Sequence, residues 1–526
     1  MFIYDETFEF SLLSILIIGS KNLTDYHTIV IGGGISGLTT GAYLAKSGKK
    51  VLVIEQNSVP GGYWTSFIRN GIIFDITAHW TVGSQEVNKL LEELGMAPLE
   101  FSPHEPLSHY INTKNGSKII LTKDKEQFIN SIKKSFPMVK EESLNKLFQI
   151  SLAIDKELNS IKYQNQELMS FFSKLILKVN SFIKLRKTIR YSIKSAANLL
   201  QELFPGEELE GLRSSLHSIA PIKDISAIGM LVFIGFALKE RAFHPVGGAK
   251  KVAQAFIEAL EKNGGEILLS QKVKKILVED KKIIGVKLEN NEKFKSKFVV
   301  STVDAHQTFS KLLDPKLVPN KFKERIDSTP LSDTFFIVSL VTDINPEIYG
   351  FDKSEFFIGS SLNFEESIAP NNPGKSGFVI TIPHYKTERA KPNTYGIQLA
   401  TIATFDYEGY WNAGPNLQRG EDYKKLKETF AFKLIKRAEE VIPDLSNHLL
   451  NIDIATPITM HRYTLNYQGA AVGWHYTIVK PWKQKIPFIK GLFIAGHWTG
   501  PSGIPSVIYS GRSAAELILR QNIRTI

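Results

Sequence analysis

The fold class of this chain of 526 residues is decided by one stretch, Thr28-Ile29-Val30-Ile31-Gly32-Gly33-Gly34-Ile35-Ser36-Gly37. Its first four residues predict a short buried strand, and the glycines that follow have the spacing GxGxxG. An Ala-, Leu- and Gly-rich helix is expected to run to Lys46 and stop at Gly48, before a second strand from Val51 to Ile54. This order of strand, glycine turn, helix and strand predicts a βαβ unit that binds a dinucleotide.

Each glycine of the motif has a physical role that a side chain would prevent. Gly32 allows the tight turn, Gly34 lets the backbone approach a pyrophosphate, and Gly37 lets the helix lie close to its strand. The helix start offers unpaired N–H groups and a positive dipole end to the phosphates, and Glu55 at the tip of the second strand can bind a ribose hydroxyl. The predicted cofactor contacts in this unit are Gly32, Gly34, Ser36, Gly37, Glu55 and Gln56.

The next segment adds a second glycine feature. Pro60-Gly61-Gly62 is followed by two β segments, residues 63–69 and 72–76, which the turn pair Asn70-Gly71 joins. Gly61 and Gly62 would let the chain pass close to a bound ring or phosphate, so both are predicted cofactor contacts. The βαβ unit by itself fits NAD and FAD equally, because both carry adenosine diphosphate.

Composition excludes several classes of protein. The chain is 43% hydrophobic and 22% charged, which is typical of a folded globular protein, and its 64 Lys and Arg against 53 Asp and Glu give a net charge of +11. It has no cysteine, so disulfides, Cys-ligated zinc, iron–sulfur clusters and catalytic thiols are excluded, and no metal site is expected. Residues 1–23 are interpreted as an N-terminal extension rather than a signal peptide, since acidic residues precede their apolar run. No transmembrane helix is predicted.

Three blocks of the chain resemble the FAD-dependent phytoene desaturase, carotenoid isomerase and retinol saturase family. They are the opening from Ile29 through Glu55, Gly61-Gly62 and Asn70 to Asp75, a middle block that begins at Pro245-Val246-Gly247-Gly248, and a carboxy-terminal block from Gly491 to Ala515. The resemblance implies an α/β fold: a Rossmann-like FAD-binding domain of the amine-oxidase/phytoene-desaturase type with an interleaved α+β substrate domain. It also implies that the cofactor is FAD and that the backbone of Val273 meets the adenine end.

The carboxy-terminal block can also be interpreted from its residues alone. It predicts a strand from Gly491 to Ala495, a loop from Gly496 to Gly503, and a helix from about Pro505 to Arg520. The positive start of that helix, aimed at the flavin, would stabilise the negative charge that develops on reduction. Gly496, Gly503 and Ile504 are therefore predicted cofactor contacts. The middle block, from Glu266 to Asp304, predicts a β-meander.

The predicted FAD-binding domain is discontinuous, comprising residues 24–80, 245–315 and 485–526, and the substrate domain comprises 81–244 and 316–484. No second GxGxxG unit occurs, which argues against a separate NAD(P)H domain. Oxygen or a quinone is therefore expected as the electron acceptor that reaches the flavin directly.

Residues 168–201 contain seven Lys and Arg but no Asp or Glu, and their apolar residues recur at three- and four-residue spacing. This pattern predicts a basic amphipathic helical region that lies on an anionic membrane surface, and the alternative is a solvated face of the substrate domain. No nucleic-acid partner is expected, because no nucleic-acid module is recognisable. The expected location is cytoplasmic, peripherally bound to a membrane.

Candidate catalytic residues are His79, His497 and Arg462. The two histidines each precede a tryptophan in segments expected to flank the flavin, with a structural role as the alternative for both. Arg462 follows a segment that resembles the family's path back toward the flavin, and an ion pair at the domain interface is its alternative role.

The resemblance implies an oxidoreductase that acts on carbon–carbon bonds of an apolar polyene or isoprenoid lipid, by carotenoid (phytoene) desaturation or isomerisation. A retinol-saturase-like reduction of a polyene double bond is the first alternative. An amine-oxidase-like flavoprotein and a non-catalytic prenyl-lipid carrier on the same fold are the others. The complete glycine set argues against the carrier, which has less need of an FAD site.

Overall fold

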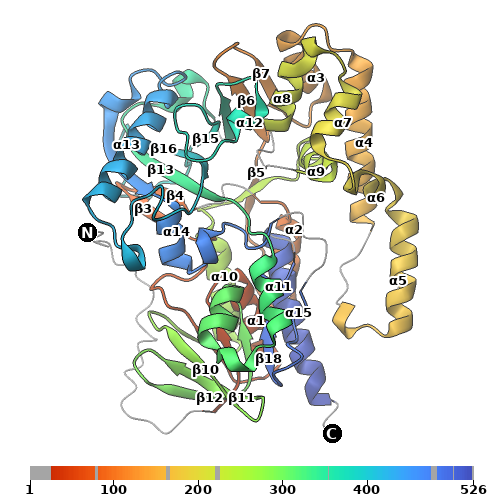
Figure 1. Ribbon diagram of the computed structural model, residues 1–526, viewed down its shortest axis with the longest axis vertical. Coiled ribbons are helices and arrows are strands. Elements are labelled where there is room, and N and C mark those ends of the chain that lie inside the picture. The colour runs from red at the N-terminus through yellow and green to blue at the C-terminus, as the bar shows by residue number, and fades with distance from the viewer. Residues whose placement is uncertain are drawn as a thin grey trace.

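The structure is a computed structural model that describes residues 25–76, 81–160, 166–218, 225–352, 355–475, 482–500 and 503–523. The predicted extension of residues 1–23 and the candidate His79 lie outside these ranges. The described chain is built around two seven-stranded sheets, one in the lower half of Figure 1 and one in the upper half. The predicted α/β class is confirmed by this architecture.

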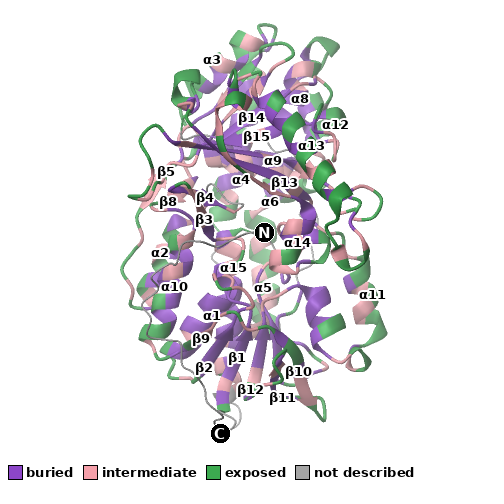
Figure 2. Ribbon diagram, turned by 90° about the vertical axis from the view of Figure 1, so that its left-hand side faces the viewer, coloured by how far each residue is buried: buried purple, intermediate pink, exposed green. Residues whose placement is uncertain are grey.

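The first sheet has a parallel core in the order β9, β2, β1, β12, β18. A hairpin of β10 and β11 extends the outer part of β12 in the antiparallel sense. Figure 2 places the parallel strands in a buried layer, whereas β10 and β11 carry exposed residues. The strands of this sheet are β1 (Asp25–Ile31), β2 (Val51–Ile54), β9 (Glu266–Leu268), β10 (Val273–Glu279), β11 (Lys282–Leu288), β12 (Lys293–Ser301) and β18 (Leu492–Ile494).

Helix α1 (Ile35–Lys46) packs against both α10 (Lys250–Lys262) and α15 (Ile504–Ile523). These three helices and α2 (Ser84–Glu93) contribute to a hydrophobic core with residues of β1, β2, β12 and β18. Elements from the beginning, middle and end of the chain therefore meet in one layer.

The second sheet runs in the order β17, β13, β16, β15, β14, β6, β7. Phe336, Val338 and Leu340 of β13 pack in a core with residues of α13 (Glu421–Ala438), and the alternate residues of β13 face the other way. The strands are β6 (Ser108–Asn112), β7 (Lys118–Leu121), β13 (Thr334–Thr342), β14 (Glu355–Gly359), β15 (Phe378–Thr381), β16 (Tyr395–Ala403) and β17 (Leu449–Ala455).

A group of helices lies beside the second sheet, at the upper right of Figure 1. Within it, α5 and α6 lie at the outer edge of the molecule. The group consists of α3 (Lys125–Ser135), α4 (Glu141–Asn159), α5 (Phe171–Lys184), α6 (Arg186–Ser192), α7 (Ala196–Leu203), α8 (Glu210–Ser218) and α9 (Ala227–Leu238). Three further helices elsewhere are α11 (Asn320–Ser328), α12 (Phe364–Ser367) and α14 (Pro457–Thr464).

Two short antiparallel strand pairs lie outside the two large sheets. β3 (Ser66–Arg69) and β4 (Ile72–Asp75) form the predicted hairpin, in which Asn70 and Gly71 both have positive φ as a type I′ turn requires. β5 (Phe101–Pro103) pairs with β8 (Phe243–Pro245). The predicted β-meander is confirmed as β10, β11 and β12, and the carboxy-terminal strand and helix as β18 and α15. The domain boundaries given above stay a prediction.

Candidate functional site

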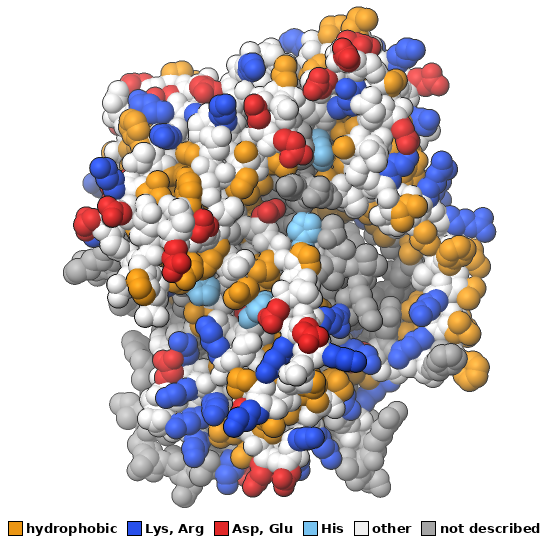
Figure 3. All heavy atoms as spheres, viewed as in Figure 1, with side chains coloured by type: hydrophobic (Ala, Val, Ile, Leu, Met, Phe, Trp, Pro, Cys, Tyr) orange, Lys and Arg blue, Asp and Glu red, His pale blue; other side chains and the backbone are white. Residues whose placement is uncertain are grey.

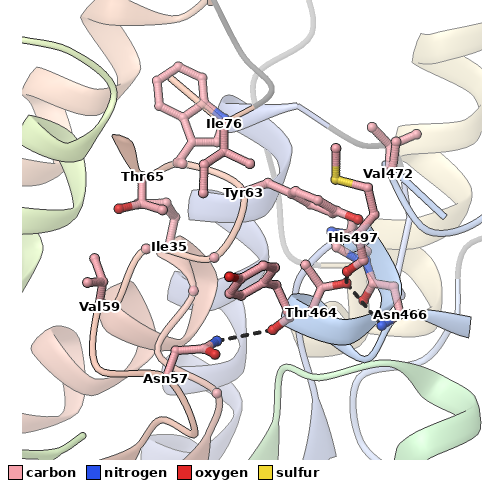
Figure 4. A pocket seen from close by; sticks show the side chains of 18 of the residues that line it. Ile35, Asn57, Val59, Tyr63, Thr65, Ile76, Thr464, Asn466, Val472 and His497 are labelled. Atoms are coloured by element: carbon pink, nitrogen blue, oxygen red, sulfur yellow. Dashed lines mark hydrogen bonds between the residues drawn. The ribbon is translucent and has the colours of Figure 1, made fainter. Parts of the chain in front are cut away.

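A cavity of about 1160 Å³ is lined by residues of both sheets. On one side lie the glycine turn after β1, the tip of β2 and the start of α15. On the other lie alternate residues of β13, β14, β15 and β16. In the close view of Figure 4, Ile35, Asn57, Val59 and Thr65 lie on one side, and Thr464, Asn466, Val472 and His497 lie on the other.

Backbone rather than side chains forms the wall at the glycine turn. Gly34 precedes the first residue of α1, and no atom lies within 4 Å of the position that a Cβ would occupy there. The Gly61 N–H donates to the Gly33 carbonyl over 2.8 Å, and a Cβ on Gly62 would lie 3.4 Å from the Gly34 Cα. This open, glycine-bounded space fits a pyrophosphate that lies directly on the backbone.

The start of α1 carries no acidic residue in its first turn, and its positive dipole end favours a bound phosphate. The Ser36 Oγ there is buried and has no hydrogen-bond partner among the described residues. Gly37 serves a different purpose, because a Cβ at that position would lie 2.0 Å from the Gly32 carbonyl oxygen. Gly37 therefore fixes the turn rather than lining the cavity.

Glu55 lies beneath the turn and is held by it. Its Oε2 accepts a hydrogen bond from the Gly33 N–H at 2.7 Å, and its Oε1 accepts two from the backbone and side-chain nitrogens of Asn57, both at 2.9 Å. Burial raises the pKa of Glu55, and these hydrogen bonds oppose that rise. Glu55 also lines the cavity, at the position where a dinucleotide site of this type binds the ribose.

Three further segments complete this side of the cavity. Val273, the first residue of β10, lines it, as do Gly496 and, at the start of α15, Gly503 and Ile504. Eleven of the twelve predicted cofactor contacts therefore line one cavity, and the twelfth is Gly37. The residues fit FAD: an open glycine cradle, the starts of α1 and α15, which have no acidic residue in their first turns, and the Ser36 hydroxyl, unpartnered among the described residues, lie together.

His497 lines the cavity at the boundary between its two sides. Its Nε2 is buried and has no hydrogen-bond partner among the described residues, and a Cβ on Gly473 would lie 2.6 Å from its Cδ2. Burial lowers the pKa of His497 to about 4, although the carboxylate of Asp304 acts in the opposite direction. His497 is therefore a neutral imidazole at physiological pH.

Asp304 ties the two sides together. It is fully buried, its Oδ1 accepts from the Gln307 N–H at 2.8 Å, and its Oδ2 accepts from the Tyr467 N–H at 2.8 Å. The first bond holds a π-helical turn, Gln307–Leu312, after the end of β12. The second holds the segment after α14, whose residues Leu465 and Asn466 line the cavity.

Arg462 lies on the exposed part of α14, its guanidinium 5.6 Å from the ring centre of Tyr463, and it does not line the cavity. Its predicted role and that of His79, outside the described residues, stay predictions.

Sequence reasoning missed several residues of the cavity. Tyr63 lines it, donates a hydrogen bond from its hydroxyl to the Ala470 carbonyl over 3.1 Å, and has its pKa raised to about 12 by burial. Thr65 also lines it with a buried Oγ1 that has no partner among the described residues. The signal in the sequence that could have identified Tyr63 and Thr65 is their position directly after Gly61-Gly62. For Ser339 and Gln398, on the opposite wall, the sequence contains no such signal.

Comparisons with known proteins agree with this geometry. The model of the family described as flavin containing amine oxidoreductase matches residues 35–343, more than half of the chain. The all-trans-retinol 13,14-reductase of Danio rerio is 23% identical over 99% of this chain and 90% of its own. The chloroplastic prolycopene isomerase 1 of an Oncidium hybrid cultivar is 24% identical over 94% and 84%. The crystal structure of an oxidoreductase from Methanosarcina mazei superposes with a TM-score of 0.61 at 16% identity, over 94% of this chain and 100% of the other, which shows a shared fold.

Proposed function

The chain belongs to the family of flavin-containing amine oxidoreductases, and we propose that it uses FAD to oxidise, reduce or isomerise carbon–carbon double bonds of an apolar polyene. The predicted FAD cofactor, oxidoreductase class and amine-oxidase-type fold are confirmed by the family match. The substrate class is supported by the relatives, whose names specify retinol and prolycopene.

One observation carries the proposal: the cavity that contains the glycine turn is also lined by an apolar wall. Ile337, Ala400, Val379 and Phe357 are direct neighbours across four strands, and all four line the same cavity as Gly34. Such a wall excludes water from an elongated apolar chain and holds it beside the cofactor.

When bound, FAD exchanges a hydride with a substrate carbon placed against its ring, and this chemistry needs no dedicated protein acid. The chain contributes positioning, the positive start of α15 and the neutral imidazole of His497. Because His497 carries no proton on one nitrogen at neutral pH, it is suited to accept a hydrogen bond at the cofactor boundary rather than to supply a charge.

The reaction direction we favour is desaturation or isomerisation of a carotenoid-type polyene, with a retinol-saturase-like reduction next. Desaturation removes two electrons and two protons from the substrate, as a hydride and a proton, so oxygen or a quinone would have to remove the electrons from the flavin. Isomerisation has no net electron transfer and needs no acceptor.

The visible spectrum of the purified holoprotein separates these reactions. Phytoene in liposomes, added anaerobically, would bleach the oxidised flavin if the protein is a desaturase. Pre-reduced protein would be reoxidised by a polyene if it is a saturase, and would change the polyene isomer composition at constant flavin spectrum if it is an isomerase. An unchanged flavin and unchanged polyene in all three assays would contradict the proposal.

Amine oxidation is a second candidate with one observation in its favour. The carboxylate of Glu355 lines the cavity, and a carboxylate is the side chain that would attract an ammonium group. Reduction of the flavin by a primary or secondary amine, and not by any polyene, would establish this alternative.

We further propose that α5 binds the protein to the anionic, cytoplasmic surface of a membrane. Its side chains Phe172, Ile176 and Phe182 are 74%, 61% and 66% exposed, and Lys178 and Lys184 are exposed among them. In Figure 3 hydrophobic and Lys or Arg side chains alternate along the right-hand edge, where Figure 1 places α5. Exposed aromatic and aliphatic side chains interleaved with lysines are what a peripheral helix inserts between anionic lipids. No helix among the described residues is long and apolar enough to cross a bilayer.

Liposome flotation tests this surface. Lys178→Glu with Lys184→Glu is expected to weaken binding to phosphatidylserine vesicles at least about 30-fold, since each of the two basic residues near the surface is worth about 1 kcal/mol. The matched control, Lys425→Glu with Lys433→Glu on the exposed side of α13, should bind as the unmodified protein does. An equal loss of vesicle binding in the two double variants would mean that binding depends on net charge alone and not on α5.

A further inference from the structure

The cavity wall of the second sheet carries a polar row directly beside its apolar row. Ser339 on β13 stands opposite Gln398 on β16, which in turn stands opposite Thr381 on β15. By the same register Glu355 of β14 continues the row, next to the pair Phe356 and Ile380. Of these residues, Ser339, Gln398 and Glu355 line the cavity.

The amide of Gln398 has an acceptor that nothing in the described structure satisfies. The side chain is 1% exposed, and its Nε2 donates to the Asp75 carbonyl at 3.2 Å and to the Ser339 Oγ at 2.9 Å. These two bonds use both amide hydrogens. The Oε1 of Gln398 is buried and has no partner among the described residues.

The orientation of this amide follows from its partners. A backbone carbonyl only accepts, so the group facing the Asp75 oxygen must be the amide nitrogen, and turning the amide over would set two acceptors against each other. The oxygen is thereby left on the remaining side. Ser339 accepts from Gln398 and donates no hydrogen bond within the described residues, so its hydroxyl hydrogen is also available.

We propose that Ser339 and Gln398 bind the hydroxyl group of an alcohol-ended polyene, which makes them specificity-determining residues for the proposed function on which this inference rests and favours, within that function, the retinol-saturase-like reaction over one on the hydrocarbon phytoene. An alcohol is the end group that matches the pair: it donates to the Gln398 Oε1 and accepts from the Ser339 hydroxyl. A hydrocarbon end leaves both groups unpaired, a ketone or aldehyde satisfies only Ser339, and a carboxylate would bring a negative charge against the Gln398 oxygen.

The test is a comparison of two ligands that differ in one hydrogen-bond donor. All-trans-retinol and its methyl ether are titrated against the oxidised holoprotein, and the dissociation constants are measured by quenching of tryptophan fluorescence. The unmodified protein is expected to bind the alcohol about tenfold more tightly than the ether, the ratio that one hydrogen bond to a buried group provides. Gln398→Met, which keeps the side-chain length and removes the acceptor, should bind both ligands equally.

Two further variants complete the design. Ser339→Ala removes the donor to the ligand oxygen, which the alcohol and the ether share, so it should weaken binding of both ligands about threefold and leave their ratio unchanged; this loss is the test if Gln398→Met does not retain FAD. Leu340→Met, on the opposite face of β13 and outside the cavity lining, should leave the preference unchanged.

Equal binding of both ligands by the unmodified protein would overturn the inference, because the Gln398 oxygen would then be satisfied by water. A preference that persists in Gln398→Met would place the hydroxyl elsewhere and overturn it too. If neither ligand binds to protein that holds FAD, this inference fails, whereas the polyene function as such is tested separately by the phytoene and pre-reduced flavin assays above.

Discussion

The two walls of the cavity are built in opposite ways. The cofactor wall is made of backbone: Gly34 and Gly62 leave open space, and Glu55 is held by backbone N–H groups. The substrate wall is made of side chains on four strands that lie far apart in the chain, such as Ser339 and Gln398. Few sequences can form a wall of backbone. A wall of side chains can instead be changed by single substitutions that leave the sheet behind it undisturbed. The cofactor is therefore fixed by the fold, and the substrate by substitutions within it.

The strongest test of the backbone wall is Gly34→Val. The backbone at Gly34, with φ −69° and ψ 168°, accepts any residue, so a side chain there would only fill the cofactor space. FAD binding is expected to weaken about 100-fold, as measured by retained flavin absorbance.

A matched control exists for this variant. Gly420 also precedes a helix, has φ −70° and ψ −173°, and has no atom within 4 Å of its Cβ position, but it is exposed and does not line the cavity. Gly420→Val should retain stoichiometric FAD. Equal flavin content in the two variants would show that the wall is not where the cofactor lies.

Gly37→Ala tests the packing that shapes the same wall. Because the new Cβ would lie 2.0 Å from the Gly32 carbonyl oxygen, the turn must move. The free energy of unfolding is expected to fall by about 3 kcal/mol in chemical denaturation. Gly235→Ala in α9 is the control: its Cβ would meet only atoms at 3.6 Å and beyond, so the helix should gain up to about 1 kcal/mol.

Asp304→Asn tests the joint between the two walls. Asp304 uses both carboxylate oxygens for backbone N–H groups, and an amide replaces one acceptor by a donor. We expect a loss of about 2 kcal/mol in the free energy of unfolding. Asp124→Asn is the contrast, because Asp124 accepts both of its N–H bonds with one oxygen, which asparagine retains. A loss as small as that of Asp124→Asn would mean that the two walls are not held together through Asp304.

The smallest effect is expected at His497, where the walls meet. Its pKa in the folded protein is about 4, below the ordinary value of about 6.5, so the unfolded chain binds more protons between these values. The stability that His497 contributes is therefore complete above pH 6.5 and is lost as the pH falls toward 4. Relative to His497→Gln, the unmodified protein should lose about 1 kcal/mol of unfolding free energy between pH 7 and about 5.5. Parallel stability curves would contradict a neutral, buried His497.

The sequence alone was sufficient for the cofactor wall because glycine motifs act through the backbone, and backbone conformation is local. The turn at Gly32 to Gly37, the hairpin at Asn70-Gly71 and the strand and helix at the carboxy terminus all appear where they were expected. The substrate wall could not be predicted in this way. The pairing of Ser339 with Gln398 depends on the register of β13 and β16, which begin about 60 residues apart, and local periodicity does not fix such a register.

The sheet that holds the cofactor also has a consequence for the time at which the protein can become active. Its fifth parallel strand, β18, pairs with β12, and α15 packs against α1, so the layer joins residue 25 to residue 523. A ribosome synthesises a chain from the amino terminus, so β1, α1 and β2 emerge from the ribosome hundreds of residues before β18. In the nascent chain the GxGxxG turn therefore belongs to an unfinished sheet with an exposed helix face until residues up to 523 have been synthesised. Slow or stalled synthesis would therefore lengthen the interval in which this half-built layer is exposed to aggregation.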